Sequence, residues 1–321
     1  MSDPEVLRHV VASITPASAA HGEGARRLVA GAGVPLLERL ATTLGGAQHT
    51  AHPRAGRRSI VVCAGDHGVG DPGVTLGEAH PTILAARAIA DGSAALAQVA
   101  RAAGAPLVLV DAGTREPAEM PPGAVRLGRG PSRDLRGEPA MTVVDAALAL
   151  EAGIALAVSL ADEGLDVLAV GAIGVGADVA SAALLGAALG AAPTGLSDAV
   201  AEEAGALGAQ LAGAGGLELL AAFGGPETGV LAGLMLCAAS THVPVILDGY
   251  ATGAAALVAA ALAPAVTGYL VAAHIGTFTH ARILAHLGLS PVFEVGLGHG
   301  EGTGAALILP WLDQVAALAG R

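Results

Sequence analysis

The stretch Ser59-Ile-Val-Val-Cys63, followed directly by Ala64-Gly-Asp-His67, decides the fold of this 321-residue chain. Its apolar and β-branched residues are typical of a strand that is buried on both faces. Glycine, an acid and a histidine follow at once, where α/β proteins carry polar groups at the ends of parallel strands. The same order recurs along the chain, so we expect repeated strand-loop-helix units.

Short runs rich in Val, Ile and Leu alternate with longer alanine-rich stretches, which is the pattern of a parallel sheet with crossover helices. The predicted strands are residues 59–63, 106–110, 165–170, 243–247, 268–272 and 291–295. The predicted helices include residues 83–103, 142–163, 227–241, 251–262 and 305–318. We therefore predict an α/β fold of three layers, built on a six-stranded, mostly parallel, Rossmann-like sheet.

Every predicted strand runs into glycine, an acid or histidine. Ligands of open parallel sheets bind beyond the carboxyl ends of the strands, so these loops together predict one active-site floor. The loops are Asp66-His67, Asp111-Ala-Gly113, Gly171-Ala-Ile-Gly-Val-Gly176, Asp248-Gly-Tyr250, Ala273-His-Ile-Gly276 and the glycine-rich run from Gly296 to Gly304. The last loop places Glu301 between glycines, either as a catalytic base or as a solvated glutamate in a turn.

The composition favours a small-molecule ligand. The chain has 28 acidic and 16 basic residues, a net charge of -12, which disfavours nucleic acid or an anionic membrane as its partner. It contains no lysine, so a Schiff-base nucleophile, a pyridoxal phosphate anchor and a Walker phosphate loop are excluded. Its length and its 53% hydrophobic content fit one large domain or two.

The chain is expected to be cytoplasmic. Cys63 and Cys237 lie within apolar stretches, as small core residues of a reducing compartment do. The first eight residues carry two acids and an arginine, unlike a secretory signal. Residues 251–281 lack Asp, Glu and Arg, but Pro264 and Gly268 interrupt them, so we predict a buried helix and strand there and not a membrane span.

The two ends of the chain fall outside the strand-helix alternation. We predict a catalytic α/β domain over residues 56–304 and a small helical accessory domain formed by residues 1–55 with 305–321. Residues 117–139 are rich in Arg, Gly and Pro, which is typical of a solvated loop, with a lid over an anionic substrate as the alternative.

Several chemical interpretations compete for the polar loops. Asp66-His67 fits an acid-imidazole pair, metal ligands or a polar cap. His299-Gly-Glu301 has the spacing of zinc deaminases, but the required Pro-Cys-x-x-Cys partner is absent. The scattered histidines match no known ligand spacing, so no metal is predicted and a metal hydrolase stays a third alternative. A nucleophile elbow is also absent, and the glycines of residues 171–176 do not fit the dinucleotide fingerprint.

Three loops occur in an order found in one enzyme family: Ala64-Gly-Asp-His-Gly-Val69, Asp248-Gly before an alanine-rich helix, and Gly300-Glu-Gly-Thr-Gly-Ala305. On these motifs the chain resembles the nicotinate-nucleotide:dimethylbenzimidazole phosphoribosyltransferase family, from about residue 55 to 310. Further matching positions are Gly73-Val74, Pro139 to Thr142, Gly174 and Gly176, Thr194-Gly195 with Asp198, Gly224-Gly225, and Leu287 to Leu289.

The resemblance implies a homodimeric α/β enzyme that moves phosphoribose from nicotinate mononucleotide to a benzimidazole nitrogen, in the synthesis of a cobamide lower ligand, without a cofactor. Glu301 matches the glutamate that serves the family as general base, a role that suits deprotonation of an azole nitrogen. The substrate-binding residues that the resemblance implies are Asp66, His67, Gly174, Gly176, Asp178, Thr194, Gly195, Asp248, His274, Gly300, Gly302 and Thr303.

Three segments depart from the family pattern, and each change bears on substrate binding. Residues 171–179 lack an acid and the amide and hydroxyl donors expected around the nucleotide, and they add Asp178. Residues 273–276 lack an arginine that would favour phosphate, and residues 75–78 lack the aromatic side chain of the benzimidazole pocket. Two hypotheses follow: a diverged transferase that keeps Glu301 as base, and a catalytically silent paralogue that binds a nucleotide or corrinoid precursor or partners an active homologue.

Overall fold

Strand β1 (Arg58–Gly65) lies inside the sheet of the computed structural model, which describes residues 5–70, 79–196, 199–294, 296–298 and 300–320. Its side chains alternate between the two faces, as the period of two in a strand requires. Ile60 and Val62 belong to one buried cluster, whereas Val61 and Cys63 belong to the other. Since both faces of β1 are apolar, both are covered by helices.

All neighbouring strands of the sheet are parallel, in the order β3-β2-β1-β4-β5-β6. The other strands are β2 (Leu107–Gly113), β3 (Val125–Arg126), β4 (Val167–Ile173), β5 (Val245–Leu247) and β6 (Leu270–Ala272). This is the order of a doubly wound nucleotide-binding sheet, and the chain reverses direction across it between β1 and β4. The predicted three-layer, six-stranded, Rossmann-like fold is confirmed.

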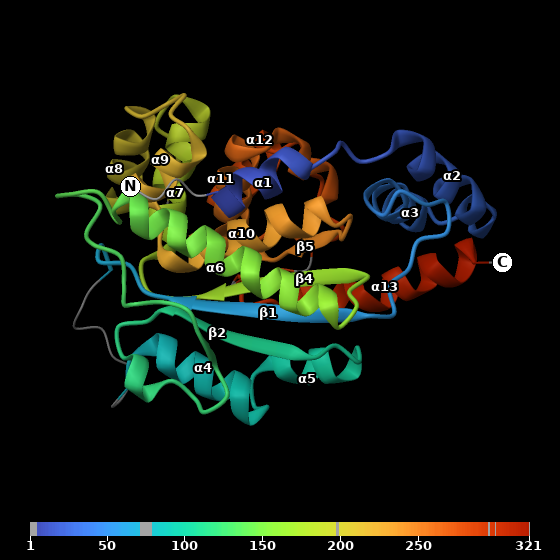
Figure 1. The fold of residues 1–321 in the computed structure, drawn as a ribbon, viewed down its shortest axis with the longest axis horizontal. Coiled ribbons are helices and arrows are strands. Elements are labelled where there is room, and N and C mark those ends of the chain that lie inside the picture. The colour runs from blue at the N-terminus through green and yellow to red at the C-terminus, as the bar shows by residue number, and fades with distance from the viewer. Residues whose placement is uncertain (1–4, 71–78, 197–198, 295, 299, 321) are drawn as a thin grey trace.

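Helices cover both faces of the sheet (Figure 1). The helices are α1 (Glu5–Ser13), α2 (Ala19–Val29), α3 (Pro35–Ala47), α4 (Pro81–Asp91), α5 (Ala95–Ala102), α6 (Val143–Asp162), α7 (Ala177–Leu189), α8 (Ala199–Ala209), α9 (Gly216–Phe223), α10 (Pro226–Ser240), α11 (Gly249–Leu262), α12 (Phe278–His286) and α13 (Thr303–Ala319). Helices α6, α10 and α11 pack on one face, and α4, α5 and α13 on the other. Short 3-10 turns occur at Ala30–Ala32, Pro117–Glu119 and Pro264–Tyr269.

The sixth strand is not the predicted one. The run from Pro291 forms only an isolated bridge between Phe293 and His274, with the N–H of Val292 donating to Ala272 at 2.9 Å. Pro291 has no N–H to add to such a ladder, so pairing does not extend along the run. The sixth strand is instead β3, which lies within the Arg-rich segment predicted as a loop or lid. Residue 295, at the end of the predicted strand, lies outside the described residues.

The predicted helix over residues 83–103 is two helices. Gly92 adopts a left-handed conformation (φ 83°) that ends α4, and the carboxylate of Asp91 accepts the N–H of Ser93 at 2.8 Å. Such a turn fixes a break between helical segments. By contrast, the predicted buried helix and strand over residues 251–281 are present as α11 and β6.

Helices from the two ends of the chain meet beside the sheet. α2, α3 and α13 pack together (Figure 1). α13 also packs on β4 and α5, and α1 packs on α6 and α10. The buried clusters therefore run from these helices into the sheet without a break. The division into residues 56–304 and 1–55 with 305–321 stays a prediction.

Two stretches, Pro81–Ala102 and Val143–Asp162, are long and apolar enough by composition to cross a membrane. Core helices meet the same criterion. The first stretch is interrupted at Gly92, and the second is α6, which packs along α10.

Candidate active site

The loop Gly300-Glu-Gly-Thr-Gly304 lies over the carboxyl end of β4. The carbonyl of Gly300 accepts the N–H of Ala172 at 3.0 Å, and the backbone of Glu301 is so close to Gly171 that any side chain at Gly171 would overlap it. The side chain of Glu301 is partly buried. Among the described residues, no group donates a hydrogen bond to its carboxylate, so the fold does not use the oxygens of Glu301.

Asp248 holds the same loop from the end of the neighbouring strand β5. Its Oδ2 accepts the N–H groups of Gly302 at 2.6 Å and Gly304 at 3.1 Å, and its Oδ1 accepts Nε2 of His274 at 2.5 Å. The side chains of Asp248 and His274 are both 0% exposed. The structure thus brings four predicted site residues, Asp248, His274, Gly300 and Gly302, together around Glu301.

The two histidines near this loop differ in charge. Burial disfavours the imidazolium of His274, but the hydrogen bond and charge of Asp248 outweigh it and raise the pKa of His274. His280 of α12 lies edge-on to His274, with ring centroids 5.6 Å apart. Burial and the charge of His274 lower the pKa of His280 to about 4. His280 therefore stays neutral, and its Nδ1 accepts the N–H of Gly276 at 3.2 Å.

Asp66 ties three strand ends together. Its Oδ1 accepts the N–H of Val175 at 3.0 Å, after β4, and the hydroxyl of Thr82 at 2.5 Å, in α4. Its Oδ2 accepts the N–H of Arg115 at 2.8 Å, after β2, and lies 3.8 Å from Nδ1 of His80. Asp66 is fully buried, so its carboxylate orders the loops beside the reversal point of the sheet.

His67 forms a buried pair with Glu227. Nε2 of His67 donates to Oε1 of Glu227 at 2.9 Å, and the two side chains are 1% and 2% exposed. Burial disfavours both charges, but each partner outweighs it, so the pKa of His67 is raised and the pKa of Glu227 is lowered. Pro226 and the hydroxyl of Thr228, which accepts the N–H of Gly225 at 3.2 Å, start α10 and place Glu227 in its first turn.

Close packing against neighbouring residues requires glycine at two positions after β4. Any side chain at Gly174 would overlap the carbonyl of Gly65, and Gly176 begins α7 with a left-handed φ of 84°. Asp178 lies exposed in the first turn of α7. Burial and the charge of Asp178 raise the pKa of Tyr250 to about 12. The region around these two side chains therefore favours a neutral phenol and disfavours anions.

The remaining predicted residues lie around the edge of this region. Thr194 and Gly195 are exposed between α7 and α8, and Gly195 faces the ring of Phe278. Thr303 is buried at the start of α13, and its hydroxyl has no partner among the described residues. Residues 73–78, Asp198 and His299 lie outside the described part of the chain.

Sequence reasoning missed two charged residues at the site. Glu227 was treated only as the start of a helix, although Gly224-Gly225 before it belonged to the matching motifs. Arg115 follows β2, donates its N–H to Asp66, and reaches the carbonyl of His67 with Nη2 at 3.5 Å. Its place two residues after the end of β2 was the available signal.

The Arg-rich segment engages its own acids. Arg133 pairs with Glu138 and Arg136 with Asp134. Arg129 is exposed and, with Arg133, lines a cavity of about 260 Å³ beside α6 and Pro226. The cavity opens near the start of α10, so Arg129 is the arginine of this segment best placed to meet an anion.

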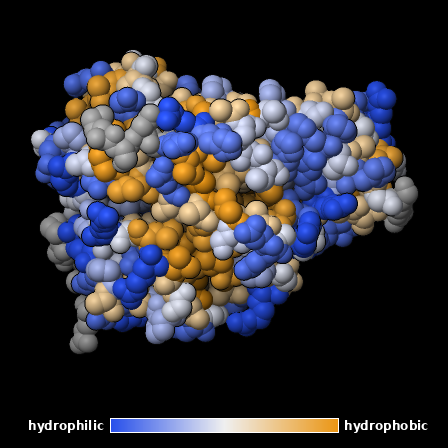
Figure 2. Space-filling view, in the orientation of Figure 1, coloured by the Kyte–Doolittle hydropathy of each residue, from blue (hydrophilic) through white to orange (hydrophobic). Residues whose placement is uncertain are grey.

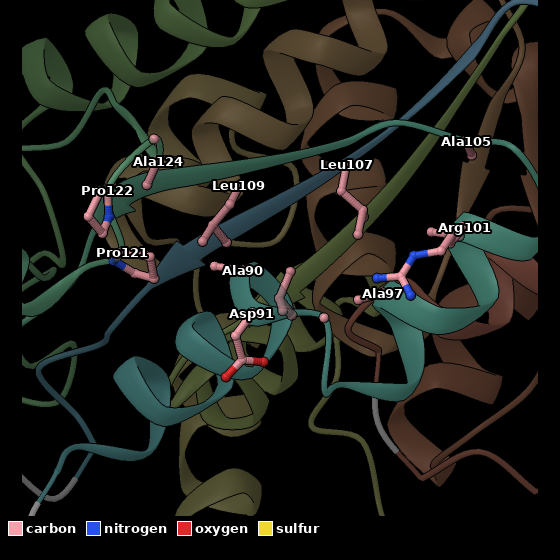
Figure 3. Close-up of a pocket in the computed structure, with 14 residues that line it drawn as sticks. Ala90, Asp91, Ala97, Arg101, Ala105, Leu107, Leu109, Pro121, Pro122 and Ala124 are labelled. Carbon is pink, nitrogen blue, oxygen red and sulfur yellow. The ribbon is translucent and has the colours of Figure 1, made fainter.

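A further cavity, of about 480 Å³, lies at the edge of the sheet (Figure 3). Leu107 and Leu109 of β2 line it, together with Asp91 and Arg101 from α4 and α5. None of its lining residues belongs to the predicted site. In the described part of the chain, no group of three or more His, Cys, Asp or Glu side chains could hold a metal ion.

Comparisons with known proteins agree on one family. A phosphoribosyltransferase family profile matches residues 15–321. The nicotinate-nucleotide–dimethylbenzimidazole phosphoribosyltransferase of Roseiflexus sp. is 39% identical over 295 residues, covering 84% of this chain and 81% of that protein, and that of Cupriavidus taiwanensis is 38% identical, covering 88% and 85%. This chain belongs to the nicotinate-nucleotide:dimethylbenzimidazole phosphoribosyltransferase family. The resemblance drawn from the loop motifs is confirmed.

The fold of the family is also shared. The solved structure of the nicotinate-nucleotide–dimethylbenzimidazole phosphoribosyltransferase of Thermus thermophilus superposes with a TM-score of 0.79 at 30% identity, covering 99% of this chain and 96% of that chain. A second structure from the same organism gives a TM-score of 0.80 at 32% identity, covering 94% and 96%. The chain therefore belongs to a family of phosphoribosyltransferases, which are enzymes that act on small molecules.

Proposed function

We propose that this protein transfers phosphoribose, or a related ribosyl group, from nicotinate mononucleotide to a benzimidazole-like base in the synthesis of a cobamide lower ligand, with Glu301 as general base. One observation carries the proposal. Glu301 is a partly buried carboxylate that the described fold leaves unbonded, on a loop fixed beside the reversal point of the sheet. Ligands of doubly wound folds bind at this point.

The chemistry needs one proton acceptor. Glu301 takes the proton of the azole N–H, and the azole nitrogen forms a bond to the anomeric carbon of the ribose. The bond from that carbon to the pyridine nitrogen breaks, and its electron pair neutralises the pyridinium, which leaves as nicotinate. A carboxylate within hydrogen-bonding reach of the azole N–H is a suitable proton acceptor for this exchange.

The loops around Glu301 would hold the two small-molecule substrates. We assign this role to Asp66, His67, Gly174, Gly176, Asp178, Thr194, Gly195, Gly300, Gly302 and Thr303. The buried carboxylate of Asp66 acts by ordering the strand ends, whereas the glycines allow a ligand close to the backbone. Asp178 lies where the N-terminus of α7 would otherwise attract phosphate. The substrate pocket is therefore altered relative to the family, toward a donor with weaker dependence on phosphate.

The test is product formation from nicotinate mononucleotide and dimethylbenzimidazole, followed by chromatography of released nicotinate. Glu301→Gln should lower the turnover number about 100- to 10,000-fold, the usual contribution of a general base. Glu294→Gln removes the same charge from an exposed position in the preceding segment and should leave turnover within about twofold. Equal turnover of Glu301→Gln and wild type would remove Glu301 as the base.

A second candidate is a catalytically silent paralogue that binds a nucleotide or corrinoid precursor or partners an active homologue. The observation behind it is the alanine at position 172 in β4, where the family pattern has an acid, together with the exposed Asp178, which adds a charge in the first turn of α7. Calorimetric binding of nicotinate mononucleotide without turnover in any azole would support this candidate. Turnover by the isolated protein would exclude it.

The proposed function extends to the cofactor requirement, assembly and location of the protein. It needs no cofactor or metal, because proton removal and a good leaving group suffice. We propose that the protein works as a homodimer in the cytoplasm, without nucleic acid or a membrane as partner, consistent with its net charge of -12.

A further inference from the structure

We infer that the buried pair of Asp248 and His274 positions Glu301 and does not bind substrate. The inference rests on the proposed function, because it takes Glu301 as the group that acts on the acceptor. The family resemblance assigned both residues to substrate binding, whereas their contacts in the fold point to a different role.

The peptide group that follows Glu301 is fixed on both sides. Its N–H, which belongs to Gly302, donates to Oδ2 of Asp248 at 2.6 Å. Its carbonyl, which belongs to Glu301, packs against Gly171 of β4. A peptide unit held at both ends sets the direction in which the preceding side chain leaves the backbone. Asp248 therefore determines where the carboxylate of Glu301 lies.

Asp248 has little capacity left for a ligand. Its two oxygens accept three N–H groups, from Gly302, Gly304 and His274, out of about four that a carboxylate can accept. Its side chain is 0% exposed, and the loop that it holds covers it. A substrate atom reaches Asp248 only if this loop moves away, and Glu301 would move with it.

His274 makes the buried carboxylate tolerable. A carboxylate that is removed from water without a counter-charge carries a large desolvation penalty, which destabilises the fold. His274 supplies both a donor and the counter-charge, while the neighbouring His280 stays neutral and bonds the backbone at Gly276. Because His274 occupies Oδ1 of Asp248, the two loop N–H groups of Gly302 and Gly304 share Oδ2.

Two variants of His274 test this role by turnover and by amide hydrogen exchange of the loop peptide that contains Gly302 and Gly304. His274→Ala removes the donor and the charge, whereas His274→Gln keeps a donor. We expect His274→Ala to lower kcat about 100-fold, the usual effect of a displacement of about 1 Å, with the KM for either substrate changed less than about threefold. Exchange of the loop peptide should become faster, and His274→Gln should recover part of both effects.

Two controls separate the possible causes. Glu301→Gln should lower turnover about 100- to 10,000-fold and leave loop exchange unchanged, and His9→Ala, exposed on α1, should change neither. If His274→Ala does not fold, His274→Gln decides alone by the same two measurements. Unchanged loop exchange, or a raised KM at unchanged kcat, would overturn the positioning role. If wild type shows no turnover, the proposed function fails, and the exchange measurement still decides whether His274 fixes the loop.

Discussion

Two buried pairs of a histidine and a carboxylate, His67–Glu227 and His274–Asp248, lie under the carboxyl edge of the sheet. Each carboxylate would be costly to bury alone, and so would each imidazolium. Paired, they keep charges of both signs at fixed places beneath the substrate loops. The neighbouring carboxylates raise the pKa of both histidines and so favour the imidazolium in each pair.

The His67–Glu227 pair predicts a particular dependence of stability on pH. The raised pKa of His67 gives a contribution that is complete below its ordinary value of 6.5 and is lost as pH rises through the folded value. The lowered pKa of Glu227 gives a contribution that is complete above 4.5 and is lost as pH falls through the folded value. The pair should therefore stabilise the protein most between pH 4.5 and 6.5.

Urea unfolding of wild type and of Glu227→Gln at a series of pH values measures this contribution. The variant leaves His67 buried without its counter-charge, and we expect a loss of about 3–5 kcal/mol in the free energy of unfolding at about pH 6. The difference between the two proteins should shrink above pH 6.5. The double variant His67→Gln with Glu227→Gln should be less unstable than the single one, because no charge is left unpaired. A difference that stays constant from about pH 5 to 9 would contradict the charged pair.

At the scale of single residues, the sequence identifies groups that follow strands but not the partners that they find. Asp248 and His274 follow predicted strands within two residues, and Glu301 lies in the glycine-rich loop after the last predicted strand, so their common edge could be predicted. Glu227 stands 160 positions from His67, and only the packing of α10 across β1 brings the two together. No local pattern contains that contact.

At the scale of elements, the glycine loop before α13 packs closely against the start of α11. A Cβ at Gly300 would lie 2.5 Å from the carbonyl oxygen of Asp248 and 2.8 Å from Cα of Gly249. A Cβ at Gly298 meets nothing within 4 Å. These two glycines of one loop therefore give a matched comparison.

Gly300→Ala should destabilise the protein by about 1–3 kcal/mol, because the backbone at the start of α11 or of the loop must shift to admit the methyl group. It should also lower the turnover number, since the loop carries Glu301. Gly298→Ala should change the free energy of unfolding by less than about 0.5 kcal/mol. Thermal unfolding of both variants beside wild type checks the comparison, and equal stability of the two would mean that the loop has room at Gly300.

The long, strongly apolar elements could be predicted from the sequence, and the short ones could not. β1, β2 and β4 have enough β-branched residues to show their character. β3 has two residues, Val125–Arg126, and its pairing comes from the free edge of β2 and not from its own side chains. The run at Pro291 has a strand-like composition, yet the missing N–H of proline and the glycines after it limit its pairing to one bridge.

For the whole molecule, the order of strands places the site. β1 and β4 lie side by side in the middle of the sheet, with crossovers that leave in opposite directions. Asp66, after β1, bonds the backbone after β4, and the Glu301 loop lies on β4 itself. The glycine loops lie far apart along the 321 residues. The parallel sheet brings them to the same edge, where they contact one another.

The proposed homodimer has a suitable surface on α6. Figure 2 shows hydrophobic side chains gathered over this helix, and Val144, Leu148 and Val158 are 52%, 44% and 47% exposed. Their spacing places them along one side of the helix. An exposed apolar stripe of this kind is typical of an association surface. In a twofold dimer the same stripe of both subunits would be buried.

Leu148→Glu should therefore weaken the dimer. Placing a charge where two symmetry-related leucines are buried loses roughly 3 kcal/mol or more, which is about a 100-fold rise in the dissociation constant. Sedimentation equilibrium of wild type and variant over a range of concentrations measures it. Leu28→Glu, on α2 with 41% exposure, is the matched control and should leave association unchanged. A monomeric wild type would contradict the homodimer, whereas a dimer that survives Leu148→Glu would place its interface on a surface other than α6.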